Sequence, residues 1–569
     1  MTRRLVLLHP LLFAAVPVLS PAAHNPGQYR LDDLFTTAAA LLLVAATAFA
    51  VTVLMVRPWV SSERAAQLSA ILVTLAVAWF FFYYPMLALW RGHFRWLPAH
   101  DAIPLPVAVL ATITAVVLAV RHGEALPAVN RTLTVIAALL VGMQTAQVAG
   151  DHLAAERAVA RSQFVRSLSA PIRTAPVPPE RNTPRRDIYL IVLDARANAA
   201  VLRERFGVDD VAFEDSLRAL GFTIPRDMQS NYVLTVVSIP SLLNFEHVTA
   251  LAHDVGEHTR DYAVPKRLVQ ENRAASFLKA RGYKYVLFPS TRWRATERSP
   301  LADDVFDARS GFGWRGELWR TELRLGIVHS SLLRAARWLQ VERRSEPEFN
   351  ARTLNGLKRL AADTAPTFAV AHFMLPHGPF LVDSACAPSA HPLLRMGEVD
   401  TPRGRAAYLA QVWCANKMVL DFATTVLRES PTPPIILVVG DHGTKLTGAG
   451  FLAHPERASA AYVRERFGAF GAFYAPAGGD SLFAGRVTLV NVMRQVLRYY
   501  FGAELSVAPD HQFVSGNLPY KFYRRDQLKS AREPARVPTY GAAADGPQSE
   551  SGECDASNGC GAPAGDSPR

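Results

Sequence analysis

Polar residues that can bind a metal ion follow three apolar stretches of this sequence. Asp194 ends one stretch, and Asp441 with His442 ends a second. His377 comes shortly after a third. Carboxylate oxygen together with imidazole nitrogen suits Zn²⁺ or Mn²⁺, whereas Ca²⁺ prefers more oxygen ligands. The residue types therefore predict a site for one divalent metal ion, with Mg²⁺ or Ca²⁺ less favoured than Zn²⁺ or Mn²⁺.

Each of these residues also has an ordinary structural interpretation. A single aspartate after a strand often caps a turn or a helix, and an Asp-His-Gly segment is often a turn. His377, which follows Pro376, could be a packed loop residue. The joint placement of two acids and two histidines after apolar stretches favours the metal site over these separate interpretations.

The apolar stretches have the pattern of strands that are buried on both faces of a parallel sheet. The four strands expected are 187–193, 283–289, 367–375 and 434–440. Helical patterns alternate with them at 211–220, 266–280, 353–363 and 405–430. This alternation predicts an α/β domain with a mainly parallel sheet. Ligands of such sheets bind at the carboxyl ends of the strands, where the polar residues stand.

An ester-cleaving metal site also needs a nucleophile, and the segment 230–244 supplies hydroxyl groups. A hydroxyl is a weak nucleophile until a metal or a base activates it. If Thr235 begins a helix, the backbone N–H groups there would also favour a bound phosphate. Ser238 and Ser241 offer the same chemistry, and all three could be ordinary polar residues at a helix start. Spacing alone leaves this choice open.

The first 150 residues contain long apolar blocks that predict a transmembrane domain of about five helices. The expected spans are 5–21, 35–56, 67–90, 103–120 and 130–149. Short loops with six lysines or arginines on one side and three on the other place residues after 150 outside the cytoplasm. The first block contains prolines and could be a cleaved signal segment, which would leave the same side outside. The spans carry almost no charge, which disfavours a transporter.

The remaining chain divides into three predicted parts. Residues 151–186 are polar, basic and proline-rich, which indicates an extended linker. Residues 187–521 form the expected catalytic domain, and 522–569 have the composition of a disordered tail. The formal net charge of +12 could serve nucleic acid, an anionic membrane or an anionic substrate. Nucleic-acid-binding motifs are missing from the sequence, so we expect no nucleic-acid partner.

The order of these motifs resembles the alkaline phosphatase/sulfatase superfamily. It is most similar to the membrane-anchored phosphoethanolamine transferases and lipoteichoic acid synthases, which carry five transmembrane helices before a sulfatase-like domain. Residues 235–240 (Thr-Val-Val-Ser-Ile-Pro) are similar to the transferases' Thr-Ala-Leu-Ser-Val-Pro. Residues 377–379 match the last three positions of their Ser-His-Gly-Pro loop, and 441–443 match their Asp-His-Gly. The resemblance implies a sulfatase-like α/β/α domain.

The resemblance also implies roles for single residues. Thr235 would be the nucleophile and a metal ligand, beside the ligands Asp194, Asp441 and His442. His377 and His454 would contact the substrate phosphate or a second, weakly bound metal. The arylsulfatase signature Cys-x-Pro-x-Arg is missing from this site, so formylglycine cannot form there. Thr-Lys follows Asp-His-Gly where the transferases have Glu-Ser, so the substrate is expected to differ.

The predicted function is a membrane-anchored, metal-dependent phosphotransferase in a bacterial inner membrane, with its catalytic domain on the periplasmic or extracellular side. It would move a phospho-alcohol group from a lipid or phosphodiester donor through phosphothreonine to a cell-envelope glycan or lipid. A phosphoric or sulfuric ester hydrolase of the same superfamily is the alternative, and a non-catalytic membrane receptor is the second. Cys386 and Cys414 are expected to pair in the extracytoplasmic domain, where disulfides persist.

Overall fold

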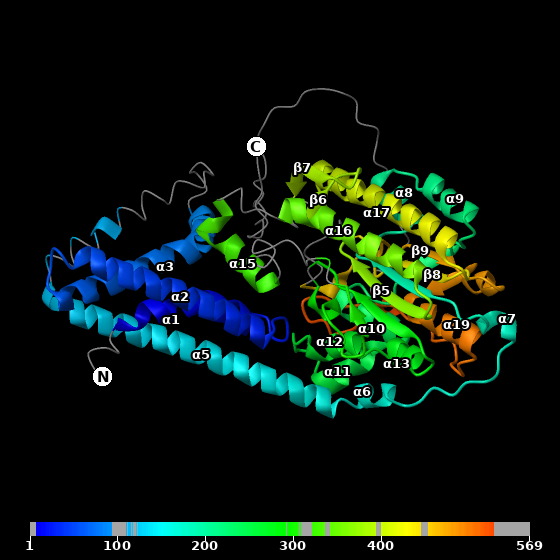
Figure 1. Cartoon of the computed structure of the whole chain (residues 1–569), viewed down its shortest axis with the longest axis horizontal. Coiled ribbons are helices and arrows are strands. Elements are labelled where there is room, and N and C mark those ends of the chain that lie inside the picture. The colour runs from blue at the N-terminus through cyan, green and yellow to red at the C-terminus, as the bar shows by residue number, and fades with distance from the viewer. Residues whose placement is uncertain are drawn as a thin grey trace, which may run out of the picture.

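The computed structural model describes residues 7–93, 123–291, 293–306, 321–335, 342–393, 400–444 and 453–528, with a few single positions between these ranges. Long helices near the N-terminus lie at one end of the molecule, and an α/β domain lies at the other (Figure 1). Most of the predicted span 103–120 falls outside the described residues, and residues 445–452 and 529–569 fall outside them entirely.

The α/β half is built on a six-stranded sheet with the order β4-β3-β5-β1-β8-β9. Neighbouring strands from β4 to β8 are parallel, and only β9 runs antiparallel to β8. The strands are β1 (Ile188–Leu193), β3 (Lys284–Phe288), β4 (Asp304–Val305), β5 (Thr367–Phe373), β8 (Ile435–Gly440) and β9 (Gly471–Tyr474). The predicted α/β class and its mainly parallel sheet are confirmed, and β1, β3, β5 and β8 are the four strands expected from the sequence.

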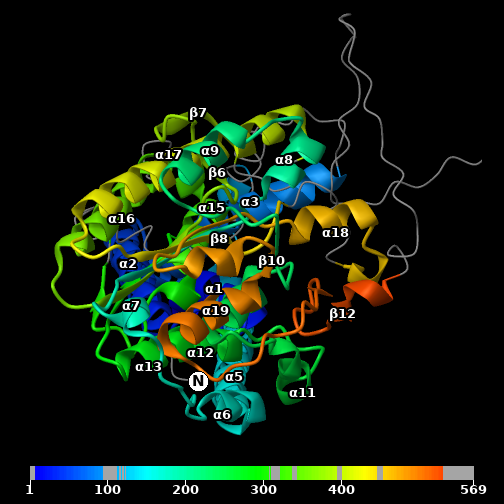
Figure 2. The same cartoon turned by 90° about the vertical axis from the view of Figure 1, so that its right-hand side faces the viewer.

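Helices cover both faces of the sheet, and each face has its own apolar core. Alternate residues of β1 divide between them, with Leu190 in one core and Ile191 in the other. Figure 2 shows the two helical layers on opposite sides of the sheet. One layer contains α10 (Thr235–Asn244), α13 (Arg273–Lys279) and α19 (Leu489–Phe501), and the other contains α9 (Val211–Ala219), α16 (Glu342–Arg359) and α17 (Pro402–Glu429).

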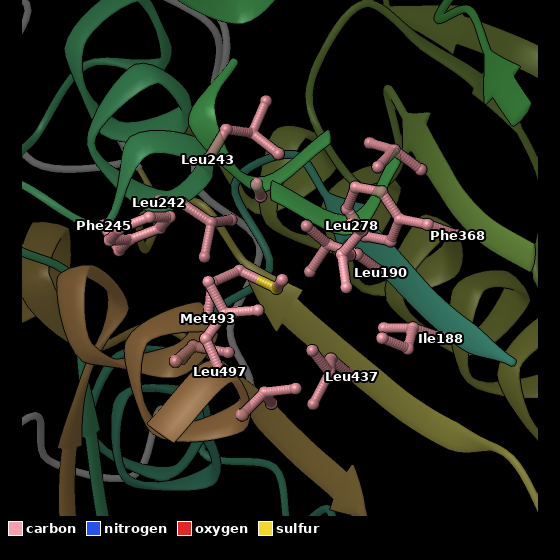
Figure 3. Packing of buried hydrophobic residues seen from close by; sticks show 14 of the residues in the cluster. Ile188, Leu190, Leu242, Leu243, Phe245, Leu278, Phe368, Leu437, Met493 and Leu497 are labelled. Carbon is pink, nitrogen blue, oxygen red and sulfur yellow. The ribbon is translucent and has the colours of Figure 1, made fainter. Parts of the chain in front are cut away.

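The first of these cores fixes the helix that carries Thr235. Leu242 and Leu243 of α10 belong to the same apolar core as Met493 and Leu497 of α19, and Leu242 lies on the side of α10 that faces Met493 (Figure 3). Leu242 and Leu243 are at most 1% exposed. Burying a leucine side chain contributes roughly 1.5–3 kcal/mol. This packing therefore holds the N-terminus of α10 in place relative to the ends of the strands.

The region predicted as one helix at 266–280 is two helices instead. α12 (Ala263–Gln270) ends before Asn272, and α13 begins at Arg273. The Asn272 side chain accepts a hydrogen bond from the backbone N–H of Ala275. Asparagine is a strong N-cap residue, so it starts a new helix although the apolar spacing continues through it. The expectation of one continuous helix was wrong for this local reason.

Three described helices are long and apolar enough to cross a membrane. They are α2 (Leu31–Val56), α3 (Ser62–His93) and α5 (Leu126–Arg161). The first predicted span is α1 (His9–His24), a helix of 16 residues that packs among the other three. Buried His9 joins α1 to its neighbours, because its ring nitrogens lie 2.6 Å from Thr74 Oγ1 and 2.7 Å from Asn130 Oδ1.

The start of the expected linker is helical in the structure. α5 continues past the predicted end of its span to Arg161, and α6 (Gln163–Leu168) follows. The junction is held by Asp254, whose carboxylate accepts hydrogen bonds from the Ser162 hydroxyl at 2.6 Å and the Phe164 N–H at 2.8 Å. α5 also contacts α12 of the α/β half. The two halves of the chain are therefore in direct contact.

Cys386 and Cys414 form a disulfide bond, as expected. The bond joins the turn after β6 (Phe380–Val382) to α17, across a sequence separation of 28 residues. Such a cross-link stabilises a fold mainly by restricting the unfolded chain. Structural disulfides persist in oxidising compartments, which agrees with an extracytoplasmic position for this domain.

Asp187, just before β1, is expected to make the protein less stable as the pH rises from about 4 to 6. Burial, and then the charge of Asp363, raise the pKa of Asp187 to about 6. The folded state therefore binds this proton more tightly than the unfolded chain does. The stabilisation is present at low pH and is lost as the pH rises through these two pKa values.

The variant Asp187→Asn does not titrate and keeps an oxygen to accept the hydrogen bond from the Thr367 N–H. Its stability relative to wild type should therefore rise by ~2 kcal/mol between pH 4 and pH 7. Thermal unfolding of the full chain in detergent micelles would measure the difference, with the exposed Asp215→Asn as control. A difference that stays constant over this pH range would contradict the prediction.

Candidate active site

The carboxyl end of β1 places Asp194 at the edge of the sheet. The Asp194 N–H donates to the carbonyl of Phe373 at the end of β5, which extends the parallel ladder by one residue. The next residue, Ala195, has a φ of 60°, in the left-handed region that only a few non-glycine residues occupy. This backbone turns the chain away from the sheet and leaves the Asp194 side chain, 2% exposed, facing the neighbouring strand ends.

Asp441 and His442 follow β8, the strand beside β1. Asp441 Oδ1 accepts hydrogen bonds from the N–H groups of Ala195 at 3.0 Å and His442 at 2.9 Å. His442 Nδ1 lies 2.9 Å from the carbonyl oxygen of Gly443, so it carries the proton and leaves the lone pair of Nε2 for another partner. A Cβ atom at Gly443 would lie 1.9 Å from the carbonyl oxygen of Glu465, so this position requires glycine.

Thr235 is the first residue of α10, and its Oγ1 lies 3.2 Å from His442 Nε2. Ser238 and Ser241 have other partners. Ser238 Oγ donates to the carbonyl of Asp441 at 2.6 Å, and Ser241 Oγ donates to the carbonyl of Glu246 at 2.8 Å. Both serines are 1% exposed, whereas Thr235 is half-buried and lines a cavity. The sequence could not show which of these three hydroxyls is the candidate nucleophile. In the structure, the hydroxyl of Thr235 is the one that lies beside the candidate metal ligands.

Asp194, Asp441 and His442 form a buried cluster whose ligand atoms all lie within 4.8 Å of one another. His442 Nε2 is 4.0 Å from Asp194 Oδ1 and 3.4 Å from Asp441 Oδ2. These three residues were predicted from separate places in the sequence, and the structure brings them together. Their roles as metal ligands remain a prediction.

Burial and the neighbouring charges shift the pKa values of the three residues in this cluster in different directions. Burial raises the pKa of Asp441, and the adjacent charge of Asp194 raises it further. Burial would also raise the pKa of Asp194, but His377, His372 and His442 outweigh it and lower that pKa below its usual range. Burial and the positive charge of Arg466 lower the pKa of His442. Two acids this close favour a cation between them, because a divalent ion would compensate both charges.

The donor set fits a divalent metal ion on two further observations. Asp194 Oδ1 and Asp441 Oδ2 are buried oxygens with no hydrogen-bond partner in the structure. A buried carboxylate oxygen without a partner costs free energy unless a cation or a donor satisfies it. Two carboxylates, one imidazole nitrogen and the nearby Thr235 oxygen also make a mixed oxygen and nitrogen set that suits Zn²⁺ or Mn²⁺.

Two residues near this cluster were missed by the sequence reasoning. His372 is the sixth residue of β5 and is 1% exposed, with its Nε2 3.3 Å from Asp194 Oδ2 and its ring edge-on to Trp293. Arg466, 3% exposed, donates to the carbonyl oxygens of Gly443 and Val233, and so joins the loops that carry His442 and Thr235. A histidine inside an otherwise apolar strand was the available signal for His372. The sequence offers no comparable signal for Arg466.

The two histidines predicted to contact substrate lie in different surroundings. His377 is half-buried after β5 and is close enough to Asp194 to lower its pKa. His454 is exposed and has its Nδ1 3.3 Å from Glu456 Oε1 on the surface. Neither belongs to the cluster of three candidate metal ligands found among the described residues. Substrate contact by His377 and His454 stays a prediction.

A cavity of about 590 Å³ opens at Thr235. One wall comes from the α/β half, including Arg260, Lys266 and Trp293. The facing wall is the turn 24–28, which connects α1 to α2 in the membrane half. The two cationic side chains suit an anionic ligand. Because the turn belongs to helices that pack in the membrane bundle, the cavity lies where the two halves of the chain meet.

No protein-family model matches this chain, and no curated protein sequence matches it. Solved structures do match it. The zinc complex of the C-terminal periplasmic domain of EcEptC from Escherichia coli is 13% identical over 63% of this chain and 99% of that chain, with a TM-score of 0.40. The lipoteichoic acid synthase LtaP from Listeria monocytogenes is 11% identical over 63% of this chain and 84% of that chain, with a TM-score of 0.39.

A third match is to an integral membrane protein. The integral membrane protein lipooligosaccharide phosphoethanolamine transferase A (EptA) from Neisseria meningitidis is 12% identical, with a TM-score of 0.37. That match covers 88% of this chain and 96% of that chain. Two of these titles, lipoteichoic acid synthase and phosphoethanolamine transferase, name the two families that the sequence motifs resemble.

Proposed function

We propose that this protein is a membrane-anchored phosphotransferase in which Thr235 receives a phospho-alcohol group from a lipid-linked or phosphodiester donor. The observation that carries the proposal is the position of Thr235 Oγ1, 3.2 Å from His442 Nε2, beside a buried cluster of two carboxylates and one imidazole and at the edge of a cavity. A nucleophile in contact with substrate-sized space and with charged ligands is the arrangement that phosphoryl transfer requires.

Different residues of this chain would bind the metal, attack phosphorus and protonate the leaving group in the first step. A divalent metal held by Asp194, Asp441 and His442 would, when bound, lower the pKa of the Thr235 hydroxyl. The Thr235 oxygen then forms a bond to phosphorus while the bond from phosphorus to the leaving alcohol breaks. The hydroxyl proton passes to water, and the leaving oxygen takes a proton from His377. Transfer to an acceptor alcohol repeats the displacement in reverse.

The shape of the cavity favours a donor that comes from the membrane. Its walls belong to both halves of the chain, so a lipid headgroup can enter beside the turn 24–28 without leaving the bilayer surface. Arg260 and Lys266 on the opposite wall would bind the phosphate. The N-terminus of α10 adds partial positive charge at Thr235, where the phosphorus would bind. We place this catalytic half, residues 187–521, on the periplasmic or extracellular side of a bacterial inner membrane.

Mass spectrometry of the peptide that contains Thr235 tests the proposal. The full chain would be reconstituted with Zn²⁺ or Mn²⁺ in vesicles of bacterial phospholipid, quenched in acid and digested. We expect a mass increase on Thr235 that equals the transferred phospho-alcohol group and that does not occur in Thr235→Ala. Turnover without any adduct on this residue, or an adduct on Ser238 instead, would overturn the proposal.

The same experiment separates transfer from hydrolysis. A transferase leaves the adduct in place until an acceptor alcohol is added, whereas a hydrolase releases the phospho-alcohol into water. The position of the turn 24–28 beside the cavity favours transfer between membrane-linked molecules, with a cell-envelope lipid or glycan as acceptor. Release of free phospho-alcohol at the rate of donor consumption would assign the chain to the hydrolases.

A further inference from the structure

A second cavity lies among the membrane helices and shares no lining residue with the cavity at Thr235. Its volume is about 770 Å³, within the range of ligand-binding pockets. Its walls come from α1, α2 and α3 and from α15 (Glu322–Ser330), a short helix inserted between β4 and β5 of the catalytic half. α15 packs against α2 and α3, as Figure 1 shows. We call this cavity the membrane groove.

Small side chains produce the membrane groove. Ala40 and Ala48 are separated by about two turns on one face of α2, and Ala76 faces them from α3. Residues at four-residue spacing lie above one another on a helix, so Ala40, Val44 and Ala48 line one side of the groove, with an alanine at each end of this row. Phe80 and Phe81 of α3 form part of its wall. Ala40 and Ala48 are exposed on a helix that is apolar and long enough to cross a membrane, so we expect lipid to contact them.

One end of the membrane groove is polar. Arg324 of α15 donates hydrogen bonds to Thr37 Oγ1 from Nε and to Thr36 Oγ1 from Nη2, both at 3.2 Å. These threonines lie within two turns of the start of α2, on the side of the bundle next to the catalytic half. Thr52, near the C-terminal end of α2, lines the other end of the membrane groove. From Thr36 to Thr52 the helix rises roughly 24 Å, so the groove is long, apolar along its length and cationic at its rim.

We propose that the membrane groove binds one acyl chain of a membrane phospholipid whose phosphate contacts Arg324. The apolar walls match the chain, and the guanidinium at the rim matches the anionic phosphate. The proposal does not depend on the chemistry at Thr235.

The lining of the membrane groove favours a phospholipid as its occupant. The groove lies on helices that are long and apolar enough to cross a membrane, so the acyl chains of the surrounding lipid can reach it. Arg324 lines its polar end and offers the lipid phosphate a partner that a purely apolar segment of the chain would not use.

Photo-crosslinking of the full chain in lipid nanodiscs tests the site. The probe is a phospholipid with a diazirine in its acyl chain, and the labelled residues are found by mass spectrometry. We expect labelling of α2 and α15 around the groove, and at least a fivefold decrease in Ala48→Phe, which fills the groove. The control Ala46→Phe makes the same change at a nearby exposed position of α2 that does not line the groove, and it should leave this labelling unchanged.

The rim is tested with two probes that carry the same diazirine chain, one a phospholipid and one a diacylglycerol without phosphate. Wild type should label several-fold more with the phospholipid, and Arg324→Gln should lose this preference while keeping the acyl-chain label. If Ala48→Phe were to disturb folding, shown by a lower unfolding temperature, Ala40→Phe fills the same groove two turns away.

Two results would overturn the proposal. One is equal labelling of the groove in wild type, Ala48→Phe and Ala46→Phe, which would indicate only general contact with lipid. The other is groove residues that react with the 103–120 stretch of the same chain and take no label from the lipid probe.

Discussion

Replacing Thr235 by alanine is expected to reduce turnover by on the order of 10⁴-fold or more, because the residue would supply the atom that bonds to phosphorus. Thr235 Oγ1 is the hydroxyl placed 3.2 Å from His442 Nε2, and the nearby serine hydroxyls are buried and hydrogen-bonded to carbonyl oxygens. No described hydroxyl in α10 is therefore positioned to replace it. The release of alcohol from a phospholipid donor, measured in vesicles that contain the full chain, reports the loss.

Two further variants make this result interpretable. Thr235→Ser keeps a hydroxyl at the same position and should retain measurable turnover, because only a methyl group is removed. Thr424→Ala removes an exposed threonine of α17 and should turn over as wild type does. Metal content should stay near the wild-type value in Thr235→Ser. Full turnover by Thr235→Ala would exclude a covalent threonine intermediate.

Replacing Asp441 by asparagine is expected to abolish stoichiometric metal binding, with the affinity falling by about 100-fold or more. The substitution keeps an oxygen to accept from the N–H groups of Ala195 and His442, so the local backbone is preserved. It replaces the other carboxylate oxygen, Oδ2, which has no hydrogen-bond partner and lies 3.4 Å from His442 Nε2. The amide group removes one negative charge and one ligand atom. Elemental analysis of the purified full chain measures the metal directly.

The unfolding temperature of the same variant gives a second test, because the direction of its change can be predicted. A bound metal at 100 times its dissociation constant stabilises the folded state by about 2.7 kcal/mol. A chelator should therefore lower the unfolding temperature of wild type and leave Asp441→Asn unchanged. Without metal, the variant should be the more stable of the two, because Asp194 and Asp441 no longer repel each other inside the protein. Asp421→Asn, at an exposed carboxylate that pairs with Lys358, is the control. One bound metal ion per chain of Asp441→Asn would rule out this ligand set.

Much of the fold could be read from residue patterns because the responsible forces are local or periodic. Continuous apolar runs correspond to β1, β3, β5 and β8, since strands covered on both faces need apolar residues at every position. The long apolar blocks correspond to α2, α3 and α5, since backbone groups in lipid must bond within one helix. The single-helix prediction for 266–280 failed at Asn272, where a side-chain cap outweighed the apolar spacing.

The sequence by itself determined which polar residues stand at the ends of strands, and therefore that Asp194, Asp441 and His442 could meet. Parallel strands carry their carboxyl ends to one edge, so this part of the site follows from chain order and sheet direction. The sequence could not show which hydroxyl of α10 is the nucleophile. Thr235, Ser238 and Ser241 differ in their hydrogen-bond partners and not in their chemical class.

Only the tertiary structure decided the remaining features. The packing of α10 on α19 turns Thr235 toward His442 and sends Ser238 to the carbonyl of Asp441. Contacts between segments far apart in the chain place His372 beside Asp194, the turn 24–28 beside Thr235, and α15 against the membrane helices. The physical reason is the same in each case: a strand or helix fixes its own residues by short-range rules, whereas the partner of a side chain depends on which distant surface is buried against it.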